Sequence, residues 1–556
     1  MKNTSLVESE QVAPPLVLPW WHGLGAWNIY FLAKLALYWG GYINFDLYYN
    51  ALLLAALLFP LRPLWLHKLR RVVAIPFGVA VLYYDTWFPP FKRLLERPEV
   101  FHFSNDYILE LLGRFINWEL VGLGFIFLVG YLFLSRWLRM TFFSVLGLCL
   151  LGLASVPWAS LPFFQKSSTS MAAVSIPTLA ATEASTSTAT PTDNRSLNEI
   201  LDQELQSFYA AEAKRQVAFE SPQSGDLAFD MLFINICSLS WADLKEVNLL
   251  NHPLFQTMDV VFDDFNSVTS YSGPAVTRLM YANCGQKTHD GLYEDLEKQC
   301  SLFDNLRNLG FETSVALNQT GEFQGFKDTL AKADPASTPL VPDQLKPALR
   351  SFYGSPLWND LEVLNLWLEQ NPKTASSKPK ALLYNTVTLH DGNREATADG
   401  GSRPSPYEKR AETLLQDLDV FLEQLEQQGR KVLVVLIPEH GASLTGDRMQ
   451  IPGMREIPTP EITHVPVGVR LIGAKAKAPA SPIHIAEPSS FLGVSELVAR
   501  IIKDNAFEEP EINWTALTTD LPQTKHVSEN EGVVIMQHEG TPYVRLQGKN
   551  WVEYKR

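Results

Sequence analysis

Hydrophobic residues divide the chain into two unlike parts. Five apolar runs fall before residue 160, and each is close to the ~20 residues that span a bilayer as a helix. They are Trp27–Phe45, Leu47–Trp65, Val72–Phe88, Ile116–Ser135 and Thr141–Trp158. Tryptophan and tyrosine cluster at the ends of the runs, as interface anchors do. The alternative is a buried helical core in a soluble protein. Because five such runs are hard to bury otherwise, the pattern favours a transmembrane bundle of about five helices over residues 1–163.

The third run is the least regular of the five because it contains Pro76 and Asp85. An acidic residue at membrane depth needs a partner or a polar cavity. Asp85 therefore either pairs with another span, faces a lipid-headgroup cavity, or lies at the membrane edge beside Trp87.

Basic residues in the short loops predict the orientation of this bundle. The loops after the second and fourth runs contain six basic residues: Arg62, Lys68, Arg70, Arg71, Arg136 and Arg139. The positive-inside rule places both loops in the cytoplasm, whereas the loop from Pro89 to Phe115 carries both signs of charge. With five spans and a cytoplasmic N-terminus, everything after Trp158 lies outside the inner membrane.

A polar linker separates the two parts. From Gln165 the sequence reads QKSSTSMAAVSIPTLAATEASTSTATPTDNRS, which has too few large apolar residues to pack. Residues 164–196 are therefore expected to be a tether. The soluble domain, residues 197–556, opens with an amphipathic helix that begins at Leu197.

Strand and helix patterns alternate through the soluble domain. Strands are expected at 231–237, 259–265, 311–318, 380–389, 431–438 and 465–473, and helices at 272–283, 291–310, 405–429 and 489–505. Apolar strands that alternate with helices predict a mostly parallel sheet sandwiched by helices, an α/β fold. Residues 531–556 read as short strands joined by glycine turns, which predicts a small C-terminal antiparallel sheet.

Charge and cysteine content narrow the possible functions. The formal net charge of −14 over 556 residues argues against a general nucleic-acid binder, which needs a basic face. Cys149 lies in an apolar run, where packing is its expected role. The other three cysteines, Cys237, Cys284 and Cys300, fall in the soluble domain.

Polar side chains follow three of the expected strands. Cys237 ends the strand at 231–237, His390 follows 380–389, and Glu439 and His440 follow 431–438. Ligands of open α/β sheets bind beyond the carboxyl ends of the strands. Each residue also has a simpler interpretation: Cys237 as a small buried hydrophobe, His390 as a loop histidine, and Glu439–His440 as a surface pair. Their shared position at one sheet edge favours a common site.

Tyr271 and Ser272 stand immediately before an expected helix. Ser272 alone is most simply a helix N-cap. Beside a thiolate, a carboxylate and an imidazole, however, its hydroxyl completes a donor set that suits zinc. A metal-activated hydroxyl is a nucleophile, and a helix N-terminus favours the negative charge of phosphate oxygens. This chemistry points to attack on a phosphodiester.

Five strings carry a resemblance to a known family: NICSLSW, SVTSYSGPA, LHDGN, IPEHGAS and MREIPTPEITHVP. They resemble the membrane phosphoethanolamine transferases of the alkaline-phosphatase/sulfatase superfamily, and most closely the cellulose branch of that family. The resemblance covers essentially the whole chain. It implies an alkaline-phosphatase-like domain on the periplasmic side of a bacterial inner membrane.

The resemblance also implies roles for individual residues. Ser272 is the nucleophile, and Cys237, Glu439 and His440 hold one zinc ion together with the Ser272 oxygen; a second zinc ion is left open. Four further residues line the phosphate and leaving-group site: Tyr271, His390, Arg455 and His464. His390 is the first candidate for the general base and His464 the second.

The implied reaction has two steps. Ser272 takes phosphoethanolamine from phosphatidylethanolamine, and a glucose C6 hydroxyl of nascent cellulose then takes it from Ser272. Cellulose synthase subunits in the inner membrane are the implied partners. The lipid A branch of the family commonly has a threonine nucleophile, a carboxylate as its first-strand ligand and an Asp-His pair. Ser272, Cys237 and Glu439 stand at those positions here, which argues against lipid A as the acceptor.

Other functions remain open at this stage. One is a phosphoethanolamine or phosphoglycerol transferase that acts on another envelope glycan. A second is a catalytically weak structural subunit of a polysaccharide synthase. Metal content and the effect of Ser272→Ala on the polymer would separate a scaffold from an enzyme.

Cys284 and Cys300 enclose the string CGQKTHDGLYEDLEKQC. An oxidising periplasm favours a disulfide between them, and closing such a loop contributes ~3 kcal/mol of stability. Two additional metal ligands are a weaker alternative because the spacing matches no compact zinc motif. Two free thiols would follow only from an inverted topology.

Overall fold

The computed structural model describes residues 23–61, 64–88, 107–109, 113, 118–154, 196–222, 227–294, 297–334, 336–372, 378–397 and 402–555. The chain forms two compact units. The first comprises Met1–Phe88 and Ile116–Pro191, and the second Pro89–Phe115 and Thr192–Arg556. The expected tether, apart from Ser196, and most of the loop from Pro89 to Phe115 lie outside the described residues.

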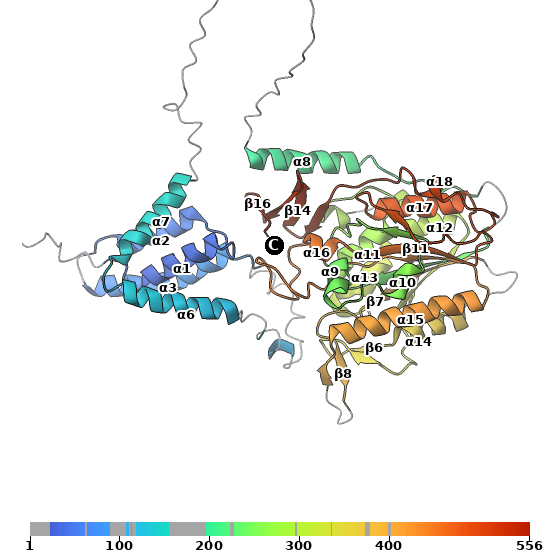
Figure 1. Ribbon diagram of the computed structural model, residues 1–556, viewed down its shortest axis with the longest axis horizontal. Helices are drawn as coiled ribbons and strands as arrows, with labels where there is room; N and C mark the ends of the chain where they lie inside the picture. Colours follow the sequence, from blue (N-terminus) through green and yellow to red (C-terminus); the bar gives the residue numbers. More distant parts are fainter. Residues whose placement is uncertain are drawn as a thin grey trace, which may run out of the picture. The chain divides into compact units, whose positions relative to one another are not determined.

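Helices form at all five apolar runs of the first unit (Figure 1). They are α1 (Trp27–Trp39), α2 (Leu47–Leu58), α3 (Leu64–Asp85), α6 (Trp118–Leu134) and α7 (Met140–Ala154). The third helix begins earlier than the apolar run, at Leu64, and continues through Pro76. No helix within the described ranges combines the length and the apolar character that crossing a membrane requires.

A buried ion pair joins three of these helices. Lys34 of α1 contacts Asp85 of α3 at 2.7 Å, and both side chains are almost fully buried. Asn50 of α2 accepts from Lys34 and donates to Asp85, each at 2.7 Å. Asp85 thus pairs with another helix, which was one of the alternatives left by the sequence. Either charge would be costly to bury without its partner. The ion pair of Lys34 and Asp85, together with the bonds of both to Asn50, therefore holds α1, α2 and α3 against one another.

An eight-stranded sheet forms the centre of the second unit, in the order β12-β2-β11-β10-β1-β7-β3-β4. The strands are β1 (Asp230–Ile236), β2 (Val260–Phe262), β3 (Glu312–Leu317), β4 (Pro339–Leu340), β7 (Lys380–Thr386), β10 (Val432–Leu436), β11 (Val467–Ile472) and β12 (Ile483–Ile485). Only β11 runs antiparallel to its neighbours, β10 and β2. The six expected strands and the mostly parallel sheet are confirmed. Strands β4 and β12 are too short for a sequence pattern to show them.

Different helices cover the two faces of this sheet (Figure 1). Alternate residues of β1 point to opposite faces, as the strand period of two requires. Met231 and Phe233 join the core under α11 (Ser272–Met280), α12 (Leu302–Asn308), α13 (Phe326–Ala333) and α17 (Phe491–Lys503). Leu232 and Ile234 join the core under α14 (Asp360–Gln370) and α15 (Tyr407–Gln427). The α/β sandwich is confirmed.

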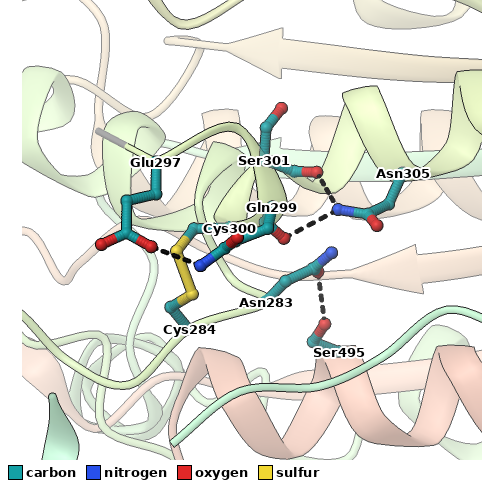
Figure 2. The surroundings of a disulfide bond; sticks show 8 residues. All are labelled: Asn283, Cys284, Glu297, Gln299, Cys300, Ser301, Asn305 and Ser495. Atoms are coloured by element: carbon teal, nitrogen blue, oxygen red, sulfur yellow. Dashed lines mark hydrogen bonds between the residues drawn. A yellow bond between two sulfur atoms is a disulfide. The ribbon is translucent and has the colours of Figure 1, made fainter. Parts of the chain in front are cut away.

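The helix expected at 291–310 is wrong over its first half. Two short 3-10 turns, Asp290–Leu292 and Lys298–Cys300, precede α12, which begins only at Leu302. The reason is a disulfide between Cys284 and Cys300, which confirms the predicted pairing and holds the two Cα atoms 5.0 Å apart. Figure 2 shows Asn305 bonding back to the carbonyls of Gln299 and Ser301, which closes the turn before the helix starts.

Two smaller sheets complete the second unit. The C-terminal one, in the order β13-β14-β15-β16, is antiparallel as expected. Its strands are β13 (Val527–Asn530), β14 (Val533–His538), β15 (Thr541–Leu546) and β16 (Val552–Glu553), and it packs under α8 (Leu197–Glu212). The other sheet was not predicted. It joins β5 (Leu349–Arg350), β6 (Pro356–Leu357), β8 (Arg394–Ala396) and β9 (Ser402–Pro404).

Candidate active site

Strands β1 and β10 are parallel neighbours, so their carboxyl ends meet at one edge of the sheet. Ile234 pairs with Leu436, and the Glu439 N–H donates to the Ile236 carbonyl at 2.8 Å. Cys237 directly follows β1, and Glu439 follows β10 after two residues. The thiol and the carboxylate therefore emerge side by side from the apolar centre of the fold.

His440 completes a cluster of three potential metal ligands. Donor atoms of Cys237, Glu439 and His440 all lie within 4.8 Å of one another, and the three residues are buried. Nδ1 of His440 lies 2.9 Å from the Gly441 carbonyl, to which it donates. That bond leaves Nε2 with its lone pair, 3.9 Å from the Cys237 sulfur. Burial and the Arg455 charge lower the pKa of His440, so the ring is held neutral, as a metal ligand must be.

Glu439 has one bonded and one unbonded carboxylate oxygen. Oε1 accepts from Asn385 at 2.6 Å, and the same amide donates to Asn235 at 2.9 Å. Oε2 is buried and has no hydrogen-bond partner among the described residues. Sequence reasoning missed Asn385 and Asn235, although an amide in each of two apolar strands was a signal that something polar lies at their ends.

These donors fit a zinc ion. An unbonded buried carboxylate oxygen is costly unless a cation or donor meets it, and Glu439 Oε2 is such an atom. Burial, together with the Glu439 carboxylate, raises the pKa of the Cys237 thiol to about 11. A coordinated divalent cation reverses that effect because it deprotonates the thiol outright. Sulfur, imidazole nitrogen and carboxylate oxygen are the ligand types that zinc takes.

Ser272 opens α11, but it is not the N-cap. Tyr271 occupies that position, and Ser272 is the first residue of the helix. This corrects the interpretation of Ser272 as a capping residue. Its Oγ instead lies 3.5 Å from the Cys237 sulfur. The hydroxyl is thus available at the metal-ligand cluster, at the positive end of a nine-residue helix.

Arg455 and Tyr271 line the same cavity as His440. One Arg455 nitrogen is 3.0 Å from both Ser238 Oγ and His440 Nδ1. The Tyr271 hydroxyl donates to Glu456 at 2.7 Å. A guanidinium that lines the same cavity as Ser272 is well suited to hold phosphate oxygens, because its planar fork pairs with two at once.

His390 faces the cluster from beyond β7. Its Nδ1 donates to the Asp391 carbonyl at 2.8 Å, which leaves Nε2 as the basic atom. Burial and Arg455 lower the pKa of His390 to about 4, so the ring is neutral at physiological pH and can accept a proton. The ring of Phe352 stacks on it, with centroids 4.6 Å apart.

One cavity of about 720 Å³ connects these residues. Its walls include Tyr271, Ser272, His390, His440 and Arg455. Its volume is that of a small-molecule or cofactor site.

Tyr107, a residue that sequence reasoning missed, also lines this cavity. It lies between α3 and α6 in the chain but belongs to the second unit. Its hydroxyl donates to Asp391 Oδ2 at 3.2 Å. No periodic pattern could have linked this position to His390.

His464 is not among the residues that line the cavity. Its Nε2 donates to the Asp263 carbonyl at 2.5 Å, and its own carbonyl accepts from Trp241 N–H. The structure therefore gives His464 a role in joining backbone segments and does not bring it to Ser272.

Comparison with known families covers most of the chain. The family described as "Cellulose biosynthesis protein BcsG C-terminal domain" matches residues 182–551, and the corresponding N-terminal domain matches residues 27–153. The chain belongs to the BcsG family. The part of the resemblance that concerns cellulose biosynthesis is thereby confirmed.

BcsG proteins of two enterobacteria are similar to this chain over nearly its full length. The Cellulose biosynthesis protein BcsG of Salmonella typhimurium is 42% identical over 555 residues, and that of Escherichia coli K12 is 43% identical over 558 residues. Each comparison covers 97% of this chain and 98% of the relative.

Two solved structures are similar to part of this chain. One is a protein in the alkaline phosphatase superfamily from Vibrio parahaemolyticus, with 11% identity and a TM-score of 0.44 over 63% of this chain and 87% of that chain. The other is the C-terminal periplasmic domain of EcEptC from Escherichia coli in complex with Zn, with 11% identity and a TM-score of 0.40 over 57% and 93%.

Proposed function

We propose that the chain transfers phosphoethanolamine from phosphatidylethanolamine to glucose C6 hydroxyls of nascent cellulose. The observation that carries the proposal is the placement of the Ser272 hydroxyl 3.5 Å from Cys237, inside the cluster of three metal-ligand side chains. Membership of a cellulose biosynthesis family supports cellulose as the acceptor.

In the first step Ser272 Oγ attacks the phosphorus of the lipid headgroup. The bond from phosphorus to the glycerol oxygen breaks, and diacylglycerol leaves with the proton that Ser272 gave up. Arg455 and the N-terminal N–H groups of α11 hold the phosphate oxygens, where negative charge builds up. The phosphoethanolamine is then an ester of Ser272.

In the second step a glucose C6 hydroxyl attacks the same phosphorus. Its proton passes to Nε2 of His390, the ring nitrogen that does not bond to the Asp391 carbonyl. The phosphorus–Oγ bond breaks, and His390 passes the proton to Ser272 Oγ. The hydrogen bond from His390 Nδ1 to the Asp391 carbonyl keeps the ring in the tautomer that this step requires.

Cys237, Glu439 and His440 would hold a zinc ion, with the Ser272 oxygen beside it. Zinc would supply positive charge next to the hydroxyl and to the phosphate oxygens. The donor set and the unbonded Oε2 of Glu439 support one ion at this place.

We further propose that the first unit anchors the chain in a bacterial inner membrane, with the N-terminus in the cytoplasm and the second unit in the periplasm. The disulfide between Cys284 and Cys300 supports an oxidising compartment for the second unit. Cellulose synthase subunits in the same membrane are the partners that would deliver the polymer.

The test uses the full-length chain, purified in detergent with zinc and phosphatidylethanolamine. Mass spectrometry of the peptide that contains Ser272 reports phosphoethanolamine on the serine, with and without a chelator. Ser272→Ala is expected to lose the adduct and to keep its zinc and its melting temperature. Thr445→Ala, at an exposed loop position, is the matched control.

Three outcomes separate the candidate functions. A chelator-sensitive adduct that a cello-oligosaccharide discharges supports the proposal. An adduct that forms only from phosphatidylglycerol identifies a phosphoglycerol transferase. No adduct from either lipid, with zinc bound and the fold intact, overturns catalysis and leaves a scaffold role in the synthase.

A further inference from the structure

A cluster of aromatic rings forms one wall of the cavity, on the side of His390. Phe323 stacks on Tyr353 with centroids 5.0 Å apart and meets Phe352 edge-on at 4.9 Å. Phe352 in turn stacks on His390 and contacts Tyr107 at 5.7 Å. All five residues line the cavity that also contains Ser272. We refer to Phe323, Phe352, Tyr353 and Tyr107 as the aromatic wall.

The wall has a buried base and an accessible edge. Phe352 and Tyr107 are 5% and 6% exposed, whereas Phe323 and Tyr353 are only half-buried. Phe323 is followed by Gln324 and Gly325, both in the left-handed region at φ 51° and 65°. Such a conformation is costly for Gln324 and is kept where the surroundings require it. It turns the chain sharply after Phe323.

Beside the wall lies a buried acceptor without a donor. Asn393 is 1% exposed, and its amide nitrogen donates to the carbonyls of Val387 and Thr388. Its Oδ1 is buried and has no hydrogen-bond partner among the described residues. Asn393 also lines the cavity. An unbonded amide oxygen of this kind indicates a ligand or water with a hydroxyl to donate.

A β-linked glucan matches this combination. Each face of a β-glucose ring carries only C–H groups, while its hydroxyls point outward around the edge. The faces pack on aromatic rings, and the hydroxyls require acceptors such as an amide oxygen. A lipid tail would match the rings but not Asn393 Oδ1, and a lone phosphate would match neither.

We infer that the aromatic wall is a binding subsite for the acceptor glucan, in which Phe323 and Tyr353 pack against sugar rings and Asn393 Oδ1 accepts from a sugar hydroxyl. The inference rests on the proposed function, which requires a polymer to reach Ser272. Because Phe352 joins the wall to His390, a glucose unit held at the wall lies on the side of the cavity where the proposed base stands.

The test separates binding from chemistry in the full-length chain in detergent. Phe323→Ala removes one of the two half-buried rings of the wall, and Phe323→Trp keeps an aromatic face. Tyr543→Ala, in the C-terminal sheet and outside the cavity lining, is the matched control. Cellopentaose binding is measured by calorimetric titration, and adduct formation and discharge on Ser272 by mass spectrometry.

Phe323→Ala is expected to weaken cellopentaose binding and raise its KM for discharge of the adduct about tenfold, with the rate of adduct formation unchanged. Phe323→Trp should restore binding. Unchanged cellopentaose affinity in Phe323→Ala, with Tyr543→Ala as reference, would overturn the subsite. If the wild-type chain forms no adduct, the proposed function fails, and the titration still decides the subsite by itself.

Discussion

The hydroxyl of Ser272 donates to the sulfur of Cys237 across 3.5 Å, although Ser272 opens α11 and Cys237 directly follows β1. The proposed nucleophile and the proposed metal ligand are therefore in direct contact. A change at Cys237 should disturb both metal binding and the chemistry of Ser272, and not only one of them.

Cys237→Ala is expected to lower the zinc content from about one ion per chain to a small fraction and to abolish the adduct on Ser272, because only two of the three side chains in the ligand cluster remain. Metal analysis of the purified chain and mass spectrometry measure the two effects. Cys149→Ala removes the other free thiol, which is exposed and belongs to the first unit, and should change neither. Equal zinc content in the two variants would contradict the ligand assignment.

Arg455→Lys is expected to slow adduct formation about a hundredfold while leaving zinc bound, since a lysine keeps the charge but cannot pair with two phosphate oxygens. Single-turnover kinetics with phosphatidylethanolamine measure the rate. Arg470→Lys, on β11 and paired with Glu426 of α15, provides the control. A wild-type rate for Arg455→Lys would remove Arg455 from the phosphate site.

Removal of the disulfide is expected to lower the free energy of unfolding by about 3 kcal/mol, because it frees a loop of 16 residues in the unfolded chain. The double variant Cys284→Ser/Cys300→Ser should melt several degrees lower than the wild type and respond no further to reductant. Tryptophan fluorescence during heating measures the transition. Its zinc content should be normal, since the pair is separate from the ligand cluster; loss of zinc would show that the loop supports the site.

Asp259 should make the second unit less stable as pH rises. The side chain is 4% exposed, and burial raises its pKa from 3.8 to about 6. The folded state thus binds a proton that the unfolded state has released, so stability falls between about pH 4 and pH 6. Asp259→Asn keeps an acceptor for the Leu471 N–H and removes the charge.

At pH 7 this variant is expected to be more stable than the wild type by about 3 kcal/mol, and at pH 3.5 by nothing measurable. Denaturant unfolding at the two pH values measures the difference. Asp343→Asn, at an exposed position, should be neutral at both. A stability gain that is the same at pH 3.5 and pH 7 would rule out titration of Asp259 as its cause.

The sequence predicted those parts of the site that lie next to regular strands. Cys237, Glu439 and His440 each follow an apolar run, and the ends of parallel neighbours meet at one sheet edge whatever the loops do. The same pattern could not show whether Ser272 is the N-cap or the first residue of its helix. The two cases differ by one residue, and a sequence pattern does not place a helix boundary that accurately.

Features that depend on contacts between distant segments could not be predicted. Acidic and apolar residues at 291–310 follow a helical period. In the structure, however, α12 begins only after Cys300, which is bonded to Cys284. His464 stands in a string that resembles the family, yet its ring turns to the Asp263 carbonyl. The aromatic wall is assembled from loops, where side chains follow no period at all.

The cavity that contains Ser272 is lined in part by Tyr107, which lies outside the C-terminal family match. The C-terminal family match begins at residue 182, and the second compact body resumes at Thr192, but Tyr107 lies before both and still bonds to Asp391. A fragment that begins in the polar tether therefore lacks Tyr107, which lines the cavity. Comparing such a fragment with the whole chain would measure how far the segment that contains Tyr107 affects the chemistry of the cavity.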